Sequence, residues 1–148
     1  MTRSERLQPV LSVAEEQDRA AALALARCRQ RLQQQEARLA ELQQYQADYA
    51  RRFRQGAGDG LGAARLSDYR AFLDRLGEAL RQQQALIESI RAECAGLERR
   101  WMAARMRLDA LGKVSARYHR QELLERERRE QAETDERSGY RGLQRGHH

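Results

Sequence analysis

The stretch that decides the fold runs from Leu66 to Tyr118 and reads LSDYRAFLDRLGEALRQQQALIESIRAECAGLERRWMAARMRLDALGKVSARY. Alternating steps of three and four residues land on apolar side chains throughout, except at Gln83 and Ser115. Such a stripe averages 3.5 residues per turn, slightly fewer than a free helix has. It stays covered only if the helix supercoils left-handed around a partner helix. We therefore expect a long helix that needs a partner.

A second stripe of the same kind precedes it, from Leu7 to Phe53. Eleven of its fourteen positions are apolar, and the polar exceptions are Asp18, Gln35 and Gln46. The stripe predicts a first helix over about residues 5–55. Pro9 suits a first helical turn, and Ser12 with Glu15 matches a capping box, so we expect regular helix to begin between residues 4 and 12.

Four alternating glycines, from Gly56 to Gly62, separate the two stripes. Each glycine costs a helix about 1 kcal/mol, so the sequence predicts a turn over 56–64 and an antiparallel arrangement. The second helix is expected over about 65–137, followed by a disordered tail over 138–148. The fold class is therefore all-α: one long antiparallel two-helix coiled-coil hairpin with a longer C-terminal helix.

The register follows from the length of the turn. Placing Phe53 opposite Tyr69 leaves fifteen residues between them to connect the two helices. The residue numbers of two side chains that face each other then add up to 122. Cys28 falls opposite Cys94 in this register. The charges beside the seam agree in sign, although each exposed pair is worth at most about 0.5 kcal/mol. The predicted pairs are Arg31 with Glu93, Glu36 with Arg91, and Arg29 with Glu98.

The composition argues against an enzyme, because a rod of two helices has a seam but no interior for a deep catalytic pocket. No catalytic triad, nucleotide-binding loop or metal-ligand spacing is present, so we expect no cofactor and no metal, and no metal site at His119, His147 or His148. Cys28 and Cys94 are expected to be small buried hydrophobes in a reducing cytosol, within reach of a crosslink on mild oxidation. Met1–Gln17 has no apolar signal-peptide core, and no run is long enough to cross a membrane.

The net charge is +6, with 28 basic and 22 acidic residues. The excess is spread along the chain, whereas nucleic-acid-binding proteins usually concentrate it on one face or one tail. We therefore expect no nucleic-acid partner. A basic helical hairpin that binds RNA or a membrane surface remains an alternative, and so does an anonymous homodimeric coiled coil.

The end of the hairpin near the turn carries more apolar surface than a two-helix seam can bury. The positions beside the seam there are Tyr45, Phe72, Ala79 and Leu86, whereas elsewhere such positions are mostly charged. Exposed apolar and aromatic patches usually mark a binding site. The alternatives are a locally wider core and a glycine-rich turn that folds over the patch.

These residues carry a resemblance to the flagellar type III export protein FliJ family. The similar segments are Leu42-x-x-Tyr45-x-x-x-Tyr49, Tyr69-Arg-Ala-Phe72-Leu73-Asp-Arg-Leu76-x-x-Ala79-Leu80-x-Gln82-Gln83, Arg6-Leu7-x-Pro9-Val10-Leu11 and Trp101-x-x-Ala104. The resemblance covers nearly the whole chain in length, turn position and motif order. It implies a non-enzymatic, monomeric hairpin that is similar in build to the rotor stalk of rotary ATP synthases.

The resemblance also implies partners and a place in the cell. The end with both termini would insert into the hexameric export ATPase FliI, the turn end would meet the export gate protein FlhA, and the chain would assist export chaperones. It would lie in the cytoplasm, at the cytoplasmic face of the inner membrane, and touch the membrane only through the export apparatus. Carried over by motif, the gate-contacting residues are Leu42, Tyr45, Tyr49, Phe72, Leu76, Ala79 and Gln83.

Two further expectations concern the role in type III secretion. The second helix outruns the first, and the segment over about 120–137 would give an ATPase ring a narrow, asymmetric rod to contact. The equivalent stalk protein of a virulence injectisome, with the same fold, is the alternative within type III secretion.

Overall fold

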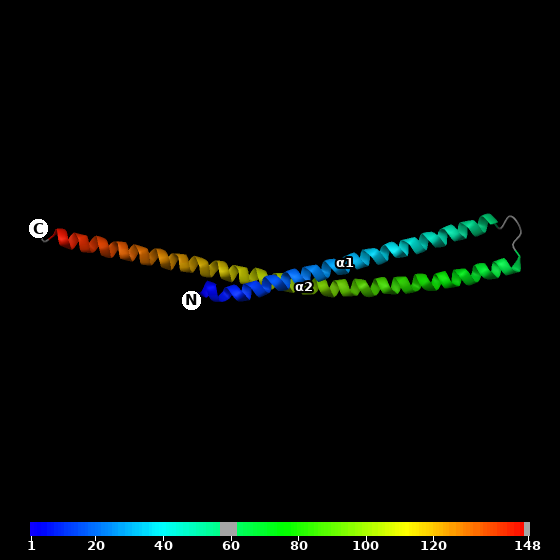
Figure 1. Cartoon of the computed structure of the whole chain (residues 1–148), viewed down its shortest axis with the longest axis horizontal. Coiled ribbons are helices and arrows are strands. Elements are labelled where there is room, and N and C mark those ends of the chain that lie inside the picture. The colour runs from blue at the N-terminus through cyan, green and yellow to red at the C-terminus, as the bar shows by residue number, and fades with distance from the viewer. Residues whose placement is uncertain (57–61, 147–148) are drawn as a thin grey trace. The chain divides into compact units, whose positions relative to one another are not determined.

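The computed structural model describes residues 1–56 and 62–146, and within these ranges it contains two helices and no strand. Helix α1 spans Arg3–Gly56 and helix α2 spans Ala63–Arg145, as labelled in Figure 1. The all-α class with a longer C-terminal helix is confirmed. Most of the predicted turn falls on residues 57–61, which lie outside the described residues.

The chain forms two units. Unit 1 consists of residues 1–19 and 102–148, and unit 2 of residues 20–101. In each unit a part of α1 packs against a part of α2.

Unit 2 is the hairpin core, and its register is the predicted one. Cys28, Ile90 and Cys94 form a buried cluster against which Leu32 and Leu97 pack. All three predicted ion pairs beside the seam are present, with N–O distances of 3.3 Å for Arg31–Glu93, 3.1 Å for Arg91–Glu36 and 3.8 Å for Arg29–Glu98. Side chains whose numbers sum to about 122 therefore meet, as an antiparallel seam requires.

Two polar interruptions of the stripes meet one another in unit 2. The Gln83 side-chain amide donates hydrogen bonds of 2.9 Å to the backbone oxygen and to the Oε1 atom of Gln35. A half-buried amide without a hydrogen-bond partner would destabilise the fold. Because Gln83 reaches Gln35 only when the two helices are aligned in this register, the pair favours this register over others.

Unit 1 has a more polar seam. Ser4, Asp18 and Ser115 are buried there beside Ala14. Arg105 Nη1 lies 3.3 Å from Asp18 Oδ2, and Ser4 donates from its backbone nitrogen and its hydroxyl to the Glu122 carboxylate at 3.1 and 2.6 Å. Beyond Glu122, every described side chain of α2 is exposed.

The start of α1 differs from the prediction. Thr2 and Glu5 form a reciprocal capping box, in which the Thr2 nitrogen donates to Glu5 Oε2 at 3.2 Å and the Glu5 nitrogen donates to Thr2 Oγ1 at 3.3 Å. Helix therefore begins at Arg3, and both Pro9 and Ser12 lie inside it. The capping box predicted at Ser12 was wrong, because an equivalent pair is available ten residues earlier.

The end of α2 also differs. Helix continues to Arg145, so a disordered tail from residue 138 was wrong for 138–145, and residues 147–148 lie outside the described residues. Gly139 and Gly142 each disfavour helix, but they follow a long segment of strong helix formers that needs no new nucleus to extend.

Candidate functional site

The candidate site is a group of five aromatic side chains in unit 2, near the end of α1 and the start of α2. We call Tyr45, Tyr49, Phe53, Tyr69 and Phe72 the aromatic cluster. The sequence supplies two interlocking sets, one from each helix, because helical residues three or four apart lie on one face.

The rings are in direct contact with one another. Phe53 stacks on Tyr69 with centroids 3.6 Å apart, and Tyr49 lies 4.1 Å from Phe72 and 5.7 Å from Tyr69. Tyr45 meets Phe72 edge-on with centroids 5.9 Å apart, and its ring is tilted relative to that of Tyr49 at 6.4 Å. The three wider pairs, at 5.7, 5.9 and 6.4 Å, lie in the range in which aromatic pairs contribute about 0.5–1.5 kcal/mol each beyond the area they bury.

The rings differ in exposure, which gives the cluster an outer edge. Tyr45 is 52% exposed, whereas Tyr49, Phe53, Tyr69 and Phe72 are half-buried. Phe72 is therefore partly covered by its aromatic neighbours rather than fully open, which is in the direction of the alternative of a locally wider core. Tyr45 forms the side that the hairpin itself does not cover.

The seven residues implied by the resemblance all lie in unit 2, but not in one environment. Leu76 is buried in the seam, Leu42 and Ala79 are half-buried, and Gln83 is engaged with Gln35. Tyr45, Tyr49 and Phe72 come together in the aromatic cluster. Tyr45 is the residue among the seven with the most surface to offer a partner.

Sequence reasoning treated Phe53 and Tyr69 as seam residues only, yet their rings belong to the same cluster. Beside them lies an open hollow of about 330 Å³. Its lining residues are Tyr49, Arg52, Phe53, Gly56, Arg65, Asp68 and Tyr69. The sequence feature that could have predicted this hollow is Gly56, because a glycine at the end of the seam has no side chain to fill the space.

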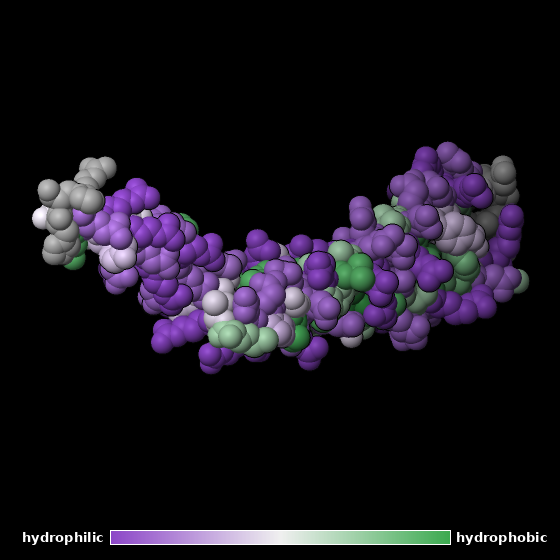
Figure 2. All heavy atoms as spheres, turned by 60° about the vertical axis from the view of Figure 1, so that its left-hand side comes forward, coloured by the Kyte–Doolittle hydropathy of each residue, from purple (hydrophilic) through white to green (hydrophobic). Residues whose placement is uncertain are grey.

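Charged side chains line the hollow together with the cluster, namely Arg52, Arg65 and Asp68, and further ion pairs lie on the same two helices. Arg81 donates to Glu78 from two guanidinium nitrogens at 2.8 and 3.2 Å, and this hydrogen bonding holds the pKa of Glu78 below its usual value. Arg51 pairs with Asp48. On the face drawn in Figure 2, most of the surface is hydrophilic, and hydrophobic residues appear as separate small areas within it. The site thus combines aromatic contact area with a polar rim, which is the anatomy of protein–protein interfaces.

Within the described residues, no group of three His, Cys, Asp or Glu side chains is placed to hold a metal ion. The same part of the chain has no helix with a stretch long and apolar enough to cross a membrane. His119 is exposed, and the two terminal histidines lie outside the described residues.

The comparisons with known proteins agree with the fold. The family model described as "Flagellar FliJ protein" matches residues 3–147, and neither a curated protein nor a solved structure matches the chain. The family is a non-enzymatic component of flagellar protein export. Because the match covers nearly the whole chain, this protein belongs to the flagellar FliJ family, which serves type III protein export in flagellum biogenesis.

Proposed function

We propose that this chain is a stalk-like rod that links the export ATPase FliI to the export gate FlhA and assists the delivery of chaperones and their substrates. It would work at the cytoplasmic face of the inner membrane, as part of the export apparatus. The observation that carries the proposal is the aromatic cluster, with Tyr45 half exposed at its edge.

The aromatic cluster supports the gate contact. Tyrosine at the edge of a packed aromatic group loses little conformational freedom on binding and offers both apolar area and a hydroxyl group, which is why such residues dominate binding energy. Leu76 is buried and Gln83 is hydrogen-bonded to Gln35 across the seam, so neither offers much surface to a partner. We assign their role to holding the helices at the correct spacing.

Unit 1 supports the ATPase contact. Beyond Glu122, α2 continues to Arg145 with its described side chains exposed. The sequence there places carboxylates four residues before guanidinium groups, as at Glu125 with Arg129 and Glu133 with Arg137, and this spacing stabilises an isolated helix by about 0.2–0.5 kcal/mol for each pair that forms. A single helix is narrow, and its surface differs from side to side, so six equivalent ATPase subunits around it would meet different contacts.

A bridging assay tests the proposal. The cytoplasmic part of FlhA is immobilised, and retention of FliI is measured with and without this chain. The full chain should increase retention of FliI. A chain that ends at Glu122 should still bind FlhA and lose the bridging. Retention of FliI by the shortened chain, or no retention by the full chain, would contradict the two-ended role.

A further inference from the structure

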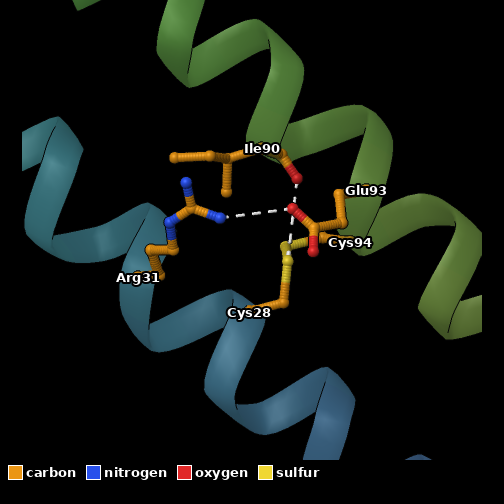
Figure 3. The surroundings of a disulfide bond; sticks show 5 residues. All are labelled: Cys28, Arg31, Ile90, Glu93 and Cys94. Atoms are coloured by element: carbon orange, nitrogen blue, oxygen red, sulfur yellow. Dashed lines mark hydrogen bonds and ion pairs between the residues drawn. A yellow bond between two sulfur atoms is a disulfide. The ribbon is translucent and has the colours of Figure 1, made fainter.

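The two cysteines of unit 2 are the feature that the proposed function leaves unused. Cys28 comes from α1 and Cys94 from α2, and they are joined as a disulfide across the seam, 66 residues apart in the chain (Figure 3). Their Cα atoms are 5.6 Å apart, which is within the range that a disulfide requires without movement of the backbone.

We propose that Cys28 and Cys94 form a reversible redox clamp, which small-molecule disulfides close and small dithiols open, and which locks the register of unit 2 when closed. The inference goes beyond the proposed function, because it concerns a covalent state of the hairpin itself.

The surroundings suit both states of the pair. In the closed state the sulfur atoms lie in an apolar cluster with Ile90, Leu32 and Leu97. In the open state each cysteine is a small hydrophobic residue. Cys28 Sγ lies 3.7 Å from the backbone oxygen of Ile90, so the thiol formed on reduction has an acceptor for its proton.

Closing the clamp is a thiol–disulfide exchange in two steps. The thiolate of one cysteine attacks a small disulfide, forms a mixed disulfide and releases one small thiol. The thiolate of the other cysteine then attacks the protein sulfur, forms the Cys28–Cys94 bond and releases the second small thiol. Two electrons pass to the small disulfide, and the two cysteine protons end on the two released thiols.

The clamp is specific for one register. A slide of one heptad would move the two Cα atoms about 10 Å further apart along the helix axes, beyond the reach of a disulfide. Beside the cysteines, Arg31 Nη1 lies 3.3 Å from Glu93 Oε2 (Figure 3). Both side chains are exposed, so this ion pair by itself stabilises the register only weakly. The covalent bond supplies the constraint that the surface charges do not.

The clamp also reports opening of the seam. Cys28 and Cys94 are only 6% and 8% exposed, so a reagent reaches their sulfur atoms only when the helices separate locally. Exchange in the folded chain should therefore be slow, and a mild denaturant should accelerate it by at least about tenfold.

The experiment follows the redox state and the thermal midpoint together. The full chain is incubated with oxidised glutathione, or with dithiothreitol, and analysed by intact mass and by thermal unfolding. We expect a monomer that has lost two hydrogens and unfolds about 10 °C above the reduced chain, because a crosslink over a long loop restricts the unfolded state strongly. Dithiothreitol should restore the lower midpoint.

The double variants Cys28→Ser with Cys94→Ser and Cys28→Ala with Cys94→Ala are the controls, and their midpoints should not respond to redox conditions. The alanine pair serves if the buried hydroxyls impair folding. A chain that stays reduced, that accumulates mixed disulfides or dimers, or that unfolds at the same temperature in both states would overturn the proposal.

Discussion

The two units close the same kind of seam by different means. In unit 2 the buried side chains are apolar and include Leu25, Ile87 and Ile90, together with the two cysteines. In unit 1 the buried side chains include Ser4, Asp18 and Ser115, and Ala14 is the buried apolar residue. Apolar burial gives stability without direction, whereas buried polar pairs select a register at a cost in stability.

We infer that the two units have different roles. Unit 2 is built to stay closed and to present the aromatic cluster, whose geometry depends on a fixed distance between the helices. Unit 1 has fewer buried apolar side chains between its helices, and its part of α2 continues beyond Glu122 with its described side chains exposed.

Truncation of the apolar seam should have the largest effect. Ile90 is 1% exposed, so Ile90→Ala should lower the free energy of unfolding by about 3 kcal/mol through lost burial and the cavity left behind. Leu108→Ala, at a half-buried seam position of unit 1, is the matched variant and should cost about half as much. Urea unfolding under reducing conditions measures both, and equal losses would remove the distinction between the units.

Replacement of the buried carboxylate should act in the opposite direction. Asp18 is buried, and its Oδ1 atom has no hydrogen-bond partner among the described residues, while its partner Arg105 is mostly exposed. Asp18→Leu should therefore raise the free energy of unfolding by about 1 kcal/mol, because it removes a buried carboxylate that is only partly hydrogen-bonded, while the Arg105 left behind stays exposed to water. The midpoint of urea unfolding checks this, and a clear decrease would show that the Asp18–Arg105 pair stabilises unit 1.

The smallest effect is a pH dependence at the other polar pair of unit 1. Hydrogen bonds from the Ser4 hydroxyl and then its backbone nitrogen hold the pKa of Glu122 below its usual value of 4.5. A lowered pKa in the folded chain means that this contact stabilises unit 1 above about pH 4.5 and that the contribution is lost as the pH falls through the lower folded value.

Titration of the Glu122 carboxyl carbon by NMR measures that pKa directly. Ser4→Ala removes the hydroxyl donor and keeps the backbone donor, so the pKa of Glu122 should rise part of the way toward its usual value. An unchanged pKa in Ser4→Ala would show that the hydroxyl is not the main cause.

Much of the fold could be predicted because it depends on periodicity and arithmetic. The two stripes determine which faces meet, and the length of the turn determines the register, which the three ion pairs and the facing cysteines confirm. The helix ends could not be predicted as well. Thr2 with Glu5 and Ser12 with Glu15 are equally good capping boxes in sequence, and only the structure shows which one is used.

The candidate site could be predicted in part. Tyr45 stands beside the seam in the heptad pattern, so we expected the opposite helix not to cover it, and the residue is exposed. The stacking of Phe53 on Tyr69 and the partial cover of Phe72 depend on ring orientations, which spacing does not specify.

We propose that the aromatic cluster, held by the closed seam of unit 2, is the surface that contacts the export gate. The most direct test is a calorimetric titration of the cytoplasmic part of FlhA with the full chain, with Tyr45→Ala, and with Leu23→Ala, an equally exposed apolar residue of unit 2 outside the cluster. We expect Tyr45→Ala to weaken binding at least about tenfold and Leu23→Ala to stay within about twofold of the unmodified chain. Equal affinities for all three chains would contradict it.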